Sequence, residues 1–271
     1  MELLWFLPPF ILLYMSIWFL LSLWIRRRDV VDLAWASGFV FLAWITLNFR
    51  DIILDERAYW VLLLVTAWGL RLFFHNYRRN LNKEDDWRYH RWHKDMPQWH
   101  YRSLKNSRAC CAAFAVYSKV FLFQGALMMI VALPVVYSLR LISLPLFSVN
   151  YLGIIFLLSG LLIETVADLQ RYRFLKKEGN ADKLITTGLW KFSRHPNYFG
   201  EIIFWWGMYF LVLGVAKSWM LIVSPLTLTY VMLFVSGLPM EERYRGRPDF
   251  EEYKRRTSAL IPWFRKKINT P

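Results

Sequence analysis

The sequence predicts an all-α, polytopic integral membrane protein, and three observations lead to this prediction. First, 56% of the 271 residues are apolar, and they gather in runs close to the roughly 20 residues that a helix needs to cross a bilayer. Second, Lys and Arg gather in alternate connections between these runs. Third, 15 Trp and 21 Phe residues are many for a soluble protein. The same composition excludes a disordered chain and a disulfide scaffold.

About seven membrane helices are expected from the apolar runs. The first covers residues 1–25, which carry one charge, at Glu2. This run is too long for a signal peptide and has no basic start, so we expect a retained helix. Polar residues interrupt the second and third runs, and only a few residues around Lys217 separate the last two, which predicts a tight helical hairpin. The six further spans are expected near residues 30–48, 58–76, 114–137, 146–168, 198–214 and 219–238.

The positive charges predict the orientation of these helices. Of the 34 basic residues, 28 lie in the first, third and fifth connections and in the tail, and only 4 lie in the remaining connections. Cytoplasmic loops carry an excess of Lys and Arg, so we expect the N-terminus outside and the C-terminus in the cytoplasm. The net charge of +14 then reflects topology, and a nucleic-acid partner is not expected.

Several kinds of site are absent from the sequence. Cys110 and Cys111 are adjacent and lie in the predicted cytoplasmic part, where no disulfide is expected. No Cys or His cluster has the spacing of a metal site, so no metal is expected. The glycine-rich phosphate motifs and the nucleophile elbow are also missing.

Ionisable residues near the cytoplasmic ends of the spans predict a polar cavity open to the cytoplasm. Asp32 opens the second span, Glu164 and Asp168 end the fifth, and Glu201 opens the sixth. Charged groups inside spans are costly and usually face a cavity or a partner. The alternative is that they are interfacial groups that reach the headgroup region. The sequence has no two repeated halves of the kind that many transporters show.

The connection before the sixth span predicts an anion-binding helix start. Ser193-Arg194-His195-Pro196-Asn197 leads directly into the apolar run, and proline suits the first turn of a helix. A helix N-terminus presents free N–H groups and a positive dipole end to an anion. The tail from 241 to 263 mixes basic, acidic and aromatic residues. By itself it is also typical of an amphipathic segment on a bilayer surface.

Two segments carry a resemblance to a known family. TTGLWKFSRHPNYFGEIIFW (186–205) and FEEYKRRTSALIPW (250–263) resemble the steroid 5-alpha-reductase-like membrane family, most closely its bacterial branch of unknown function, DUF1295. DVVDLAW (29–35), WGLR (68–71) and DDWRY (85–89) resemble the same branch. The RHPNYFGE element is shared with sterol C14 and C7 reductases and with isoprenylcysteine carboxyl methyltransferases. The resemblance implies a bacterial inner-membrane protein and specifies the superfamily more firmly than the reaction.

The resemblance implies an NADPH-dependent reductase that transfers a hydride to a carbon–carbon double bond of a lipid-soluble substrate, such as a 3-oxo-Δ4-steroid, a sterol or a polyprenoid enone. Residues 1–137 would shape the substrate pocket, and residues 138–271 would hold the cofactor. The positions that match the cofactor site are Lys176 on the phosphates, Asn197 and Glu201 on the nicotinamide, Arg194, His195 and Tyr198 in the same cavity, and Tyr253 and Arg256 in a tail that closes over it.

A hydride transfer to an enone also needs a proton donor, because the enolate must be stabilised and protonated. The chain lacks the Gln-Glu pair of the steroid reductases, and Asp32 in the second span is the candidate acid if burial raises its pKa. Tyr89, after the DDW run, is the candidate tyrosine, with Tyr77 as an alternative. These two roles rest on position and chemistry and not on a motif match.

Two other functions stay open at this stage. The first is an S-adenosylmethionine-dependent methyltransferase of the isoprenylcysteine carboxyl methyltransferase type. The second is a non-enzymatic membrane protein or a transporter. In each case the expected partners are the lipid bilayer and a small molecule, and the sequence does not determine the oligomeric state.

Overall fold

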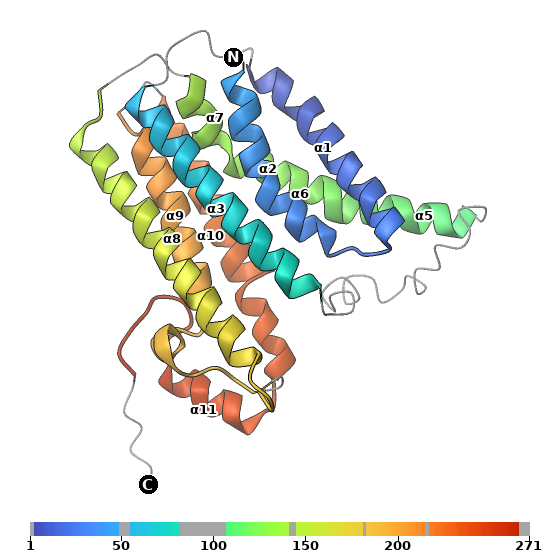
Figure 1. The fold of residues 1–271 in the computed structure, drawn as a ribbon, viewed down its shortest axis with the longest axis vertical. Helices are drawn as coiled ribbons and strands as arrows, with labels where there is room; N and C mark the ends of the chain where they lie inside the picture. The colour runs from blue at the N-terminus through green and yellow to red at the C-terminus, as the bar shows by residue number, and fades with distance from the viewer. Residues whose placement is uncertain are drawn as a thin grey trace. The chain divides into compact units, whose positions relative to one another are not determined.

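The computed structural model describes residues 3–48, 55–81, 107–140, 145–180, 183–214 and 217–265 (Figure 1). The regular elements in these ranges are helices, and the β-type pairing found there is an isolated bridge between Ser193 and Ser258. The predicted all-α class is therefore confirmed. The chain forms two compact units, Met1–Ile53 with Val61–Arg140 and Leu54–Trp60 with Leu141–Pro271, which we call unit 1 and unit 2.

The described residues contain six helical stretches that are long and apolar enough to cross a membrane, which confirms an integral, polytopic membrane protein. The sixth expected span, 198–214, is not among these six stretches and corresponds to α9 (Pro196–Val212), whose 17 residues lie at the lower limit for crossing a bilayer. The orientation of the termini and the choice of membrane stay predictions. The six stretches are Leu7–Ile25, Val30–Leu47, Glu56–Asn80, Ala113–Val131, Ser148–Leu175 and Ser218–Glu242.

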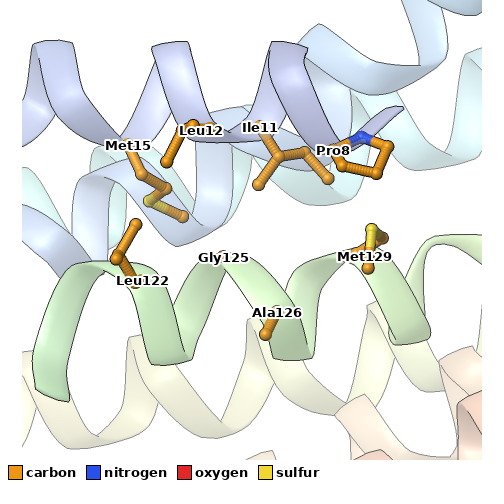
Figure 2. Close-up of a pocket in the computed structure, with 8 residues that line it drawn as sticks. All are labelled: Pro8, Ile11, Leu12, Met15, Leu122, Gly125, Ala126 and Met129. Carbon is orange, nitrogen blue, oxygen red and sulfur yellow. The ribbon is translucent and has the colours of Figure 1, made fainter. Parts of the chain in front are cut away.

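Unit 1 packs its helices through apolar faces and a few internal hydrogen bonds. The Tyr14 hydroxyl on α1 donates to the carbonyl oxygen of Ala34 on α2 at 2.9 Å, which fixes these two helices to each other. An apolar recess lies between α1 and α6 (Figure 2), lined by Pro8, Ile11, Leu12, Met15, Leu122, Gly125, Ala126 and Met129. The elements of unit 1 are α1 (Leu3–Ile25), α2 (Val30–Leu47), most of α3 (Glu56–Asn80), α5 (Ser107–Val116), the π-helical η1 (Tyr117–Leu122), α6 (Phe123–Val131) and α7 (Leu133–Arg140).

The start of α2 is tied to the end of α3 by polar side chains. The Asn76 amide donates to the carbonyl oxygen of Asp32 at 3.2 Å, and the Asn80 amide donates to that of Asp29 at 3.3 Å. Arg79 forms an ion pair with the Asp32 carboxylate at 2.5 Å between Nη2 and Oδ2. Asp32, which opens the second span, and the backbone carbonyl of Asp29 therefore help to hold two helices of unit 1 together.

Unit 2 is built around the long helix α8 and carries the tail. Helix α8 runs seven residues beyond the expected end of its span, and α9 begins at Pro196, as the proline predicted. Lys217 adopts a left-handed backbone (φ 61°) in the short connection after α9, where the sequence predicted a hairpin. The elements are α8 (Ser148–Leu175), η2 (Gly188–Lys191), α9 (Pro196–Val212), η3 (Ser218–Ile222), α10 (Val223–Tyr230), η4 (Val231–Val235), η5 (Leu238–Tyr244) and α11 (Pro248–Arg256).

Helices α8 and α9 lie side by side (Figure 1) and touch through glycine backbones. A Cβ atom at Gly160 on α8 would lie 2.6 Å from the carbonyl oxygen of Gly200 on α9. One at Gly153 would lie 2.8 Å from that of Gly207. Both helices therefore carry glycines seven residues apart, about two turns, on the same seam. Small residues of this kind allow close helix contact in membranes, where van der Waals packing drives association.

Candidate functional site at the start of α9

The glycine seam brings buried acids of α8 and α9 together near the start of α9. A Cβ atom at Gly200 would lie 2.7 Å from the backbone nitrogen of Glu164, so Glu164 adjoins the turn that holds Glu201. Glu164, Asp168 and Glu201 are 2%, 6% and 6% exposed, and each interacts with other groups of the protein. Acidic side chains are rarely buried to this extent. Their burial marks this end of the α8–α9 pair as a polar site.

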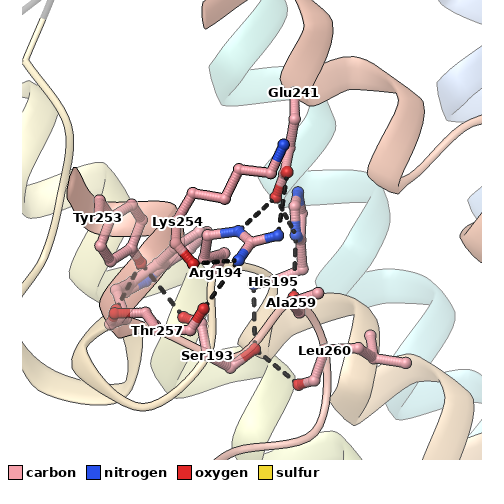
Figure 3. Close-up of polar contacts among 10 residues, drawn as sticks. Ser193, Arg194, His195, Glu241, Tyr253, Lys254, Thr257, Ala259 and Leu260 are labelled. Atoms are coloured by element: carbon pink, nitrogen blue, oxygen red, sulfur yellow. Dashed lines mark hydrogen bonds and ion pairs between the residues drawn. The ribbon is translucent and has the colours of Figure 1, made fainter. Parts of the chain in front are cut away.

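The tail folds back over the segment that leads into α9 (Figure 3). The Arg194 backbone N–H donates to the carbonyl oxygen of Ser258 at 2.8 Å, and the Ser193 hydroxyl donates to that of Leu260 at 2.6 Å. The backbone N–H of Trp263 donates to the carbonyl oxygen of Phe192 at 3.0 Å. The tail from Thr257 to Trp263 is thus attached to the start of α9 by backbone and side-chain hydrogen bonds.

Arg194 is the centre of this attachment (Figure 3). Its Nε and Nη2 atoms donate to the two carboxylate oxygens of Glu241 at 2.8 and 3.1 Å, a bidentate ion pair. Its Nη1 atom donates to the carbonyl oxygens of Thr257 at 2.8 Å and Lys254 at 3.3 Å. All three guanidinium nitrogens have protein partners. Arg194 therefore fastens η5 and the tail to the start of α9.

His195 lies beside the same carboxylate. Its Nδ1 atom is 3.1 Å from the carbonyl oxygen of Ala259 and 3.3 Å from Oε1 of Glu241. The imidazole packs in parallel against the Tyr198 ring, with 5.1 Å between the centroids. Burial lowers the pKa of His195 to about 4, and the nearby Glu241 carboxylate opposes this effect. The ring is therefore neutral at neutral pH and held from two sides.

Asn197, in the first turn of α9, has an unmatched acceptor. Its side-chain Oδ1 atom is enclosed and accepts no hydrogen bond within the described part of the chain. Enclosed polar atoms are nearly always hydrogen-bonded in proteins. The turn itself begins with Pro196 and has no side-chain cap, so its free N–H groups face outward from the helix end. Both features suit a polar ligand at the start of α9.

The remaining predicted residues of the C-terminal half differ in exposure. The Tyr253 hydroxyl donates to the carbonyl oxygen of Trp190 at 2.5 Å, and the Trp190 indole donates to that of Ala167 on α8 at 3.1 Å. Burial raises the pKa of Tyr253, so this residue holds α11 against unit 2 as a neutral phenol. Arg256 pairs with Glu252 on the same helix at 2.8 Å. Lys176 is exposed at the end of α8.

The two predicted proton donors belong to the stretches of chain that make up unit 1. Asp32 lies in unit 1, where Arg79 is its ion-pair partner. Tyr89 lies outside the described residues. Within unit 2 the structure does bring together Arg194, His195, Asn197, Tyr198 and Glu201, together with the closing tail.

Sequence reasoning missed Glu241 as a member of the site. It lies 47 residues after Arg194 at the end of the last apolar stretch. The sequence indicated either a surface segment or a tail that closes over the cofactor through Tyr253 and Arg256, and neither reading used Glu241. The available signal is its charge, because positive-inside sorting explains the basic residues of a cytoplasmic segment and leaves an acidic residue unexplained.

Three comparisons with known proteins bear on the function. A family model described as "Protein of unknown function (DUF1295)" matches residues 18–257. The curated protein "Methanethiol S-methyltransferase 1" of Bradyrhizobium diazoefficiens is 33% identical over 92 residues, which is 33% of this chain and 30% of that protein. The match thus spans less than a third of the length of the relative. No solved structure matches the chain significantly.

These findings confirm the family branch that the sequence motifs indicated and correct the expected reaction. The prediction of an NADPH-dependent reductase is wrong, because the curated relative is a methyltransferase and not an oxidoreductase. The physical reason for the error lies in Arg194. The sequence showed a cation suited to cofactor phosphates, whereas the structure gives every guanidinium nitrogen a partner inside the protein.

Proposed function

Because the chain belongs to the family of unknown function DUF1295 and a third of it is similar to a methanethiol S-methyltransferase, we propose that it is an integral membrane enzyme that transfers a methyl group from S-adenosylmethionine. The similarity to that methyltransferase carries the proposal. The acceptor we propose is a small thiol, which reaches the site from the membrane or the adjoining water.

The residues at the start of α9 fit the polar ends of S-adenosylmethionine. This molecule carries a carboxylate, an ammonium group, an adenine and a sulfonium cation. The enclosed Oδ1 atom of Asn197 would accept a hydrogen bond from the ammonium group or the adenine amine. The uncapped first turn of α9 would donate backbone N–H groups to the carboxylate.

The buried acids suit the cationic part of the same molecule. Glu164 adjoins the turn that holds Glu201 on the α8–α9 seam, and both side chains are largely shielded from water. In such surroundings a fixed negative charge acts on a nearby cation more strongly than it does in bulk water. When bound, S-adenosylmethionine would supply an electrophilic methyl group, and the two glutamates would favour its positively charged sulfonium over a neutral analogue.

The role of Arg194 also supports this cofactor. S-adenosylmethionine has no phosphate, so its site does not need a free arginine of the kind that binds the phosphates of NADPH. An arginine that is fully used by Glu241 and two carbonyl oxygens is compatible with the first ligand. It would have to give up its partners to bind the second.

Ligand binding to the detergent-purified protein tests the proposal. S-adenosylmethionine, S-adenosylhomocysteine and NADPH are compared by calorimetry and by thermal unfolding. A ligand at a hundredfold excess over its Kd stabilises the native state by about 2.7 kcal/mol. We expect S-adenosylmethionine to bind and NADPH not to bind.

The variant Asn197→Ala should weaken the binding of S-adenosylmethionine about tenfold or more. It removes the Oδ1 atom that would accept a hydrogen bond from the ammonium group or the adenine amine of the ligand. Asn48→Ala is the matched control, since the Asn48 amide bonds only to the exposed end of α2. Stabilisation by NADPH alone, or by none of the three ligands, would refute the proposed function.

A further inference from the structure

The contacts of His195 determine which of its ring nitrogens is available. Nδ1 lies 3.1 Å from the carbonyl oxygen of Ala259 and 3.3 Å from a carboxylate oxygen of Glu241. A carbonyl oxygen can only accept a hydrogen bond, so in the neutral ring the hydrogen is on Nδ1. Nε2 then carries the lone pair, because the partner of one ring nitrogen sets the state of the other.

The lone pair of Nε2 has no protein partner within the described residues. The contacts of the ring involve Nδ1 and the face that stacks on Tyr198, and Nε2 is not fully enclosed by the protein. The side chain is only 13% exposed. The Nε2 atom of His195 is therefore an oriented and accessible acceptor, two residues before Asn197 with its unmatched Oδ1 atom. This combination is typical of a general base held ready for a substrate proton.

We propose that His195 is the general base of this enzyme and that its Nε2 atom takes the proton of a thiol substrate. The inference rests on the proposed methyl transfer to a thiol and adds a catalytic residue. A base is needed because the thiolate, and not the thiol, is the nucleophile. An ordinary free thiol has a pKa near 8.5, so it is mostly protonated at neutral pH.

The step balances in atoms and charge. The S–H bond breaks, its proton moves to Nε2, and its electron pair forms the new S–CH₃ bond. The methyl group comes from the sulfonium of S-adenosylmethionine, and the pair of the broken S–CH₃ bond stays on that sulfur. One positive charge, on the sulfonium, is replaced by one positive charge, on the imidazolium. The products are a methyl thioether, the neutral S-adenosylhomocysteine and protonated His195.

The surroundings of His195 favour the neutral ring before the step, and the Glu241 carboxylate offsets part of the cost of charging the ring afterwards. Burial and the cations Arg194 and Arg171 keep the ring neutral before the transfer. Once the ring is protonated, Nδ1–H faces the Glu241 carboxylate at 3.3 Å and forms an ion pair with it. Arg194 holds that carboxylate in place. Glu241 is therefore a positioning residue that also stabilises the charged product form of the base.

The test uses His195→Asn, which keeps an amide donor toward Ala259 and removes the basic nitrogen. Two methyl acceptors are compared at pH 8: ethanethiol, which is mostly protonated, and 4-nitrothiophenol, which is already a thiolate. General base catalysis contributes about 10²- to 10⁴-fold. We expect at least a 100-fold loss of kcat with ethanethiol and less than a 5-fold loss with 4-nitrothiophenol. Asp249→Asn, which changes an exposed carboxylate of the same unit, should leave both rates unchanged.

Two measurements do not depend on turnover. The Kd for S-adenosylmethionine should change by less than about threefold in His195→Asn, as expected for a base that does not hold the cofactor. In ¹⁵N NMR spectra of histidine-labelled protein, the signal of His195 is assigned as the one that is lost in His195→Asn. At pH 7 this signal should be that of a neutral ring protonated on Nδ1. A ring protonated on Nε2 would overturn the inference.

The outcomes separate this inference from the proposed function. Equal losses with both acceptors in His195→Asn, in a protein whose wild type methylates thiols, would overturn the role of His195 and leave the methyltransferase in place. A wild type that binds S-adenosylmethionine but methylates neither acceptor would overturn the assignment of a thiol substrate and with it the base. A wild type that does not bind S-adenosylmethionine would overturn the proposed function and this inference together.

Discussion

Replacing Arg194 by methionine should release the tail from the start of α9. Methionine keeps much of the length and apolar character of the arginine stem and removes the guanidinium, which donates four hydrogen bonds to Glu241, Thr257 and Lys254. Arg194 and Glu241 are 9% and 15% exposed, so the change leaves a carboxylate largely shielded from water without its partner. Breaking a buried ion pair in this way costs about 3–5 kcal/mol.

The expected loss of free energy translates into a larger population of molecules in which the tail is detached from the start of α9. At about 1.4 kcal/mol for each factor of ten, a loss of 3 kcal/mol raises the population of the detached tail more than 100-fold. Hydrogen exchange followed by mass spectrometry measures this directly. Peptides that contain the amides of Arg194 and Trp263, which bond across the contact, should exchange more than 100-fold faster. Peptides from α1 should not change.

Arg247→Met is the matched control for this experiment. Arg247 also forms a bidentate pair with a carboxylate, but it and Asp249 are 37% and 53% exposed. Water screens a surface ion pair of this kind, which contributes little to stability, so exchange should change less than about fivefold. If Arg194→Met exchanges at the rate of Arg247→Met, the tail is held by other contacts and the argument from ion-pair burial is wrong. Glu241→Gln should reproduce much of the effect, and the double variant should lose less than the sum of the two.

Two further predictions concern the α8–α9 seam and the pH dependence of stability. Gly160→Ala should lower the free energy of unfolding by about 2 kcal/mol, because its Cβ would lie 2.6 Å from backbone atoms of α9. The control is Gly125→Ala, whose Cβ would meet only side-chain atoms at 3.1 Å, and which should change the free energy of unfolding by less than about 1 kcal/mol. Thermal unfolding in detergent measures both variants. Equal losses of stability in the two variants would argue against a backbone contact at the seam. For His195, the folded pKa of about 4 lies below the usual 6.5, so the unfolded chain binds more protons between these values and stability is lost as the pH falls through this window. Wild type should lose about 3 kcal/mol more than His195→Asn between pH 6.5 and 4, and parallel stability curves would show that the ring is not held neutral.

The spans and the start of α9 could be predicted because they depend on local properties of the chain. Apolar length and charge alternation are read directly from the sequence, and Pro196 marks a first helical turn in any context. The seam between α8 and α9 could not be predicted in the same way. Glycines recur seven apart on both helices, but only their contact shows that Gly160 faces Gly200 rather than lipid.

In the site, too, the local features could be predicted from the sequence and the long-range contacts could not. The residues of RHPNYFGE were predicted to act together, and the structure places Arg194, His195, Asn197 and Glu201 within two turns of the chain. Their roles depend on partners that are distant in sequence. Glu241 lies 47 residues from Arg194, and Ala259 lies 64 residues from His195. A pattern of residue types does not show whether an arginine is available to bind a ligand or is already paired with another residue of the protein.

This distinction also explains why one motif can serve two reactions. A start of α9 with a proline, an asparagine and a nearby glutamate can hold the polar end of different cofactors, because a helix N-terminus binds anions of many kinds. The choice between a phosphate-rich and a phosphate-free cofactor then depends on whether arginine donors are available. Here the Arg194 donors are used by Glu241 and the tail, and the same carboxylate faces His195. One ion pair thus occupies a cation that could bind phosphate and gives the neighbouring imidazole the partner that its proposed role as a base requires.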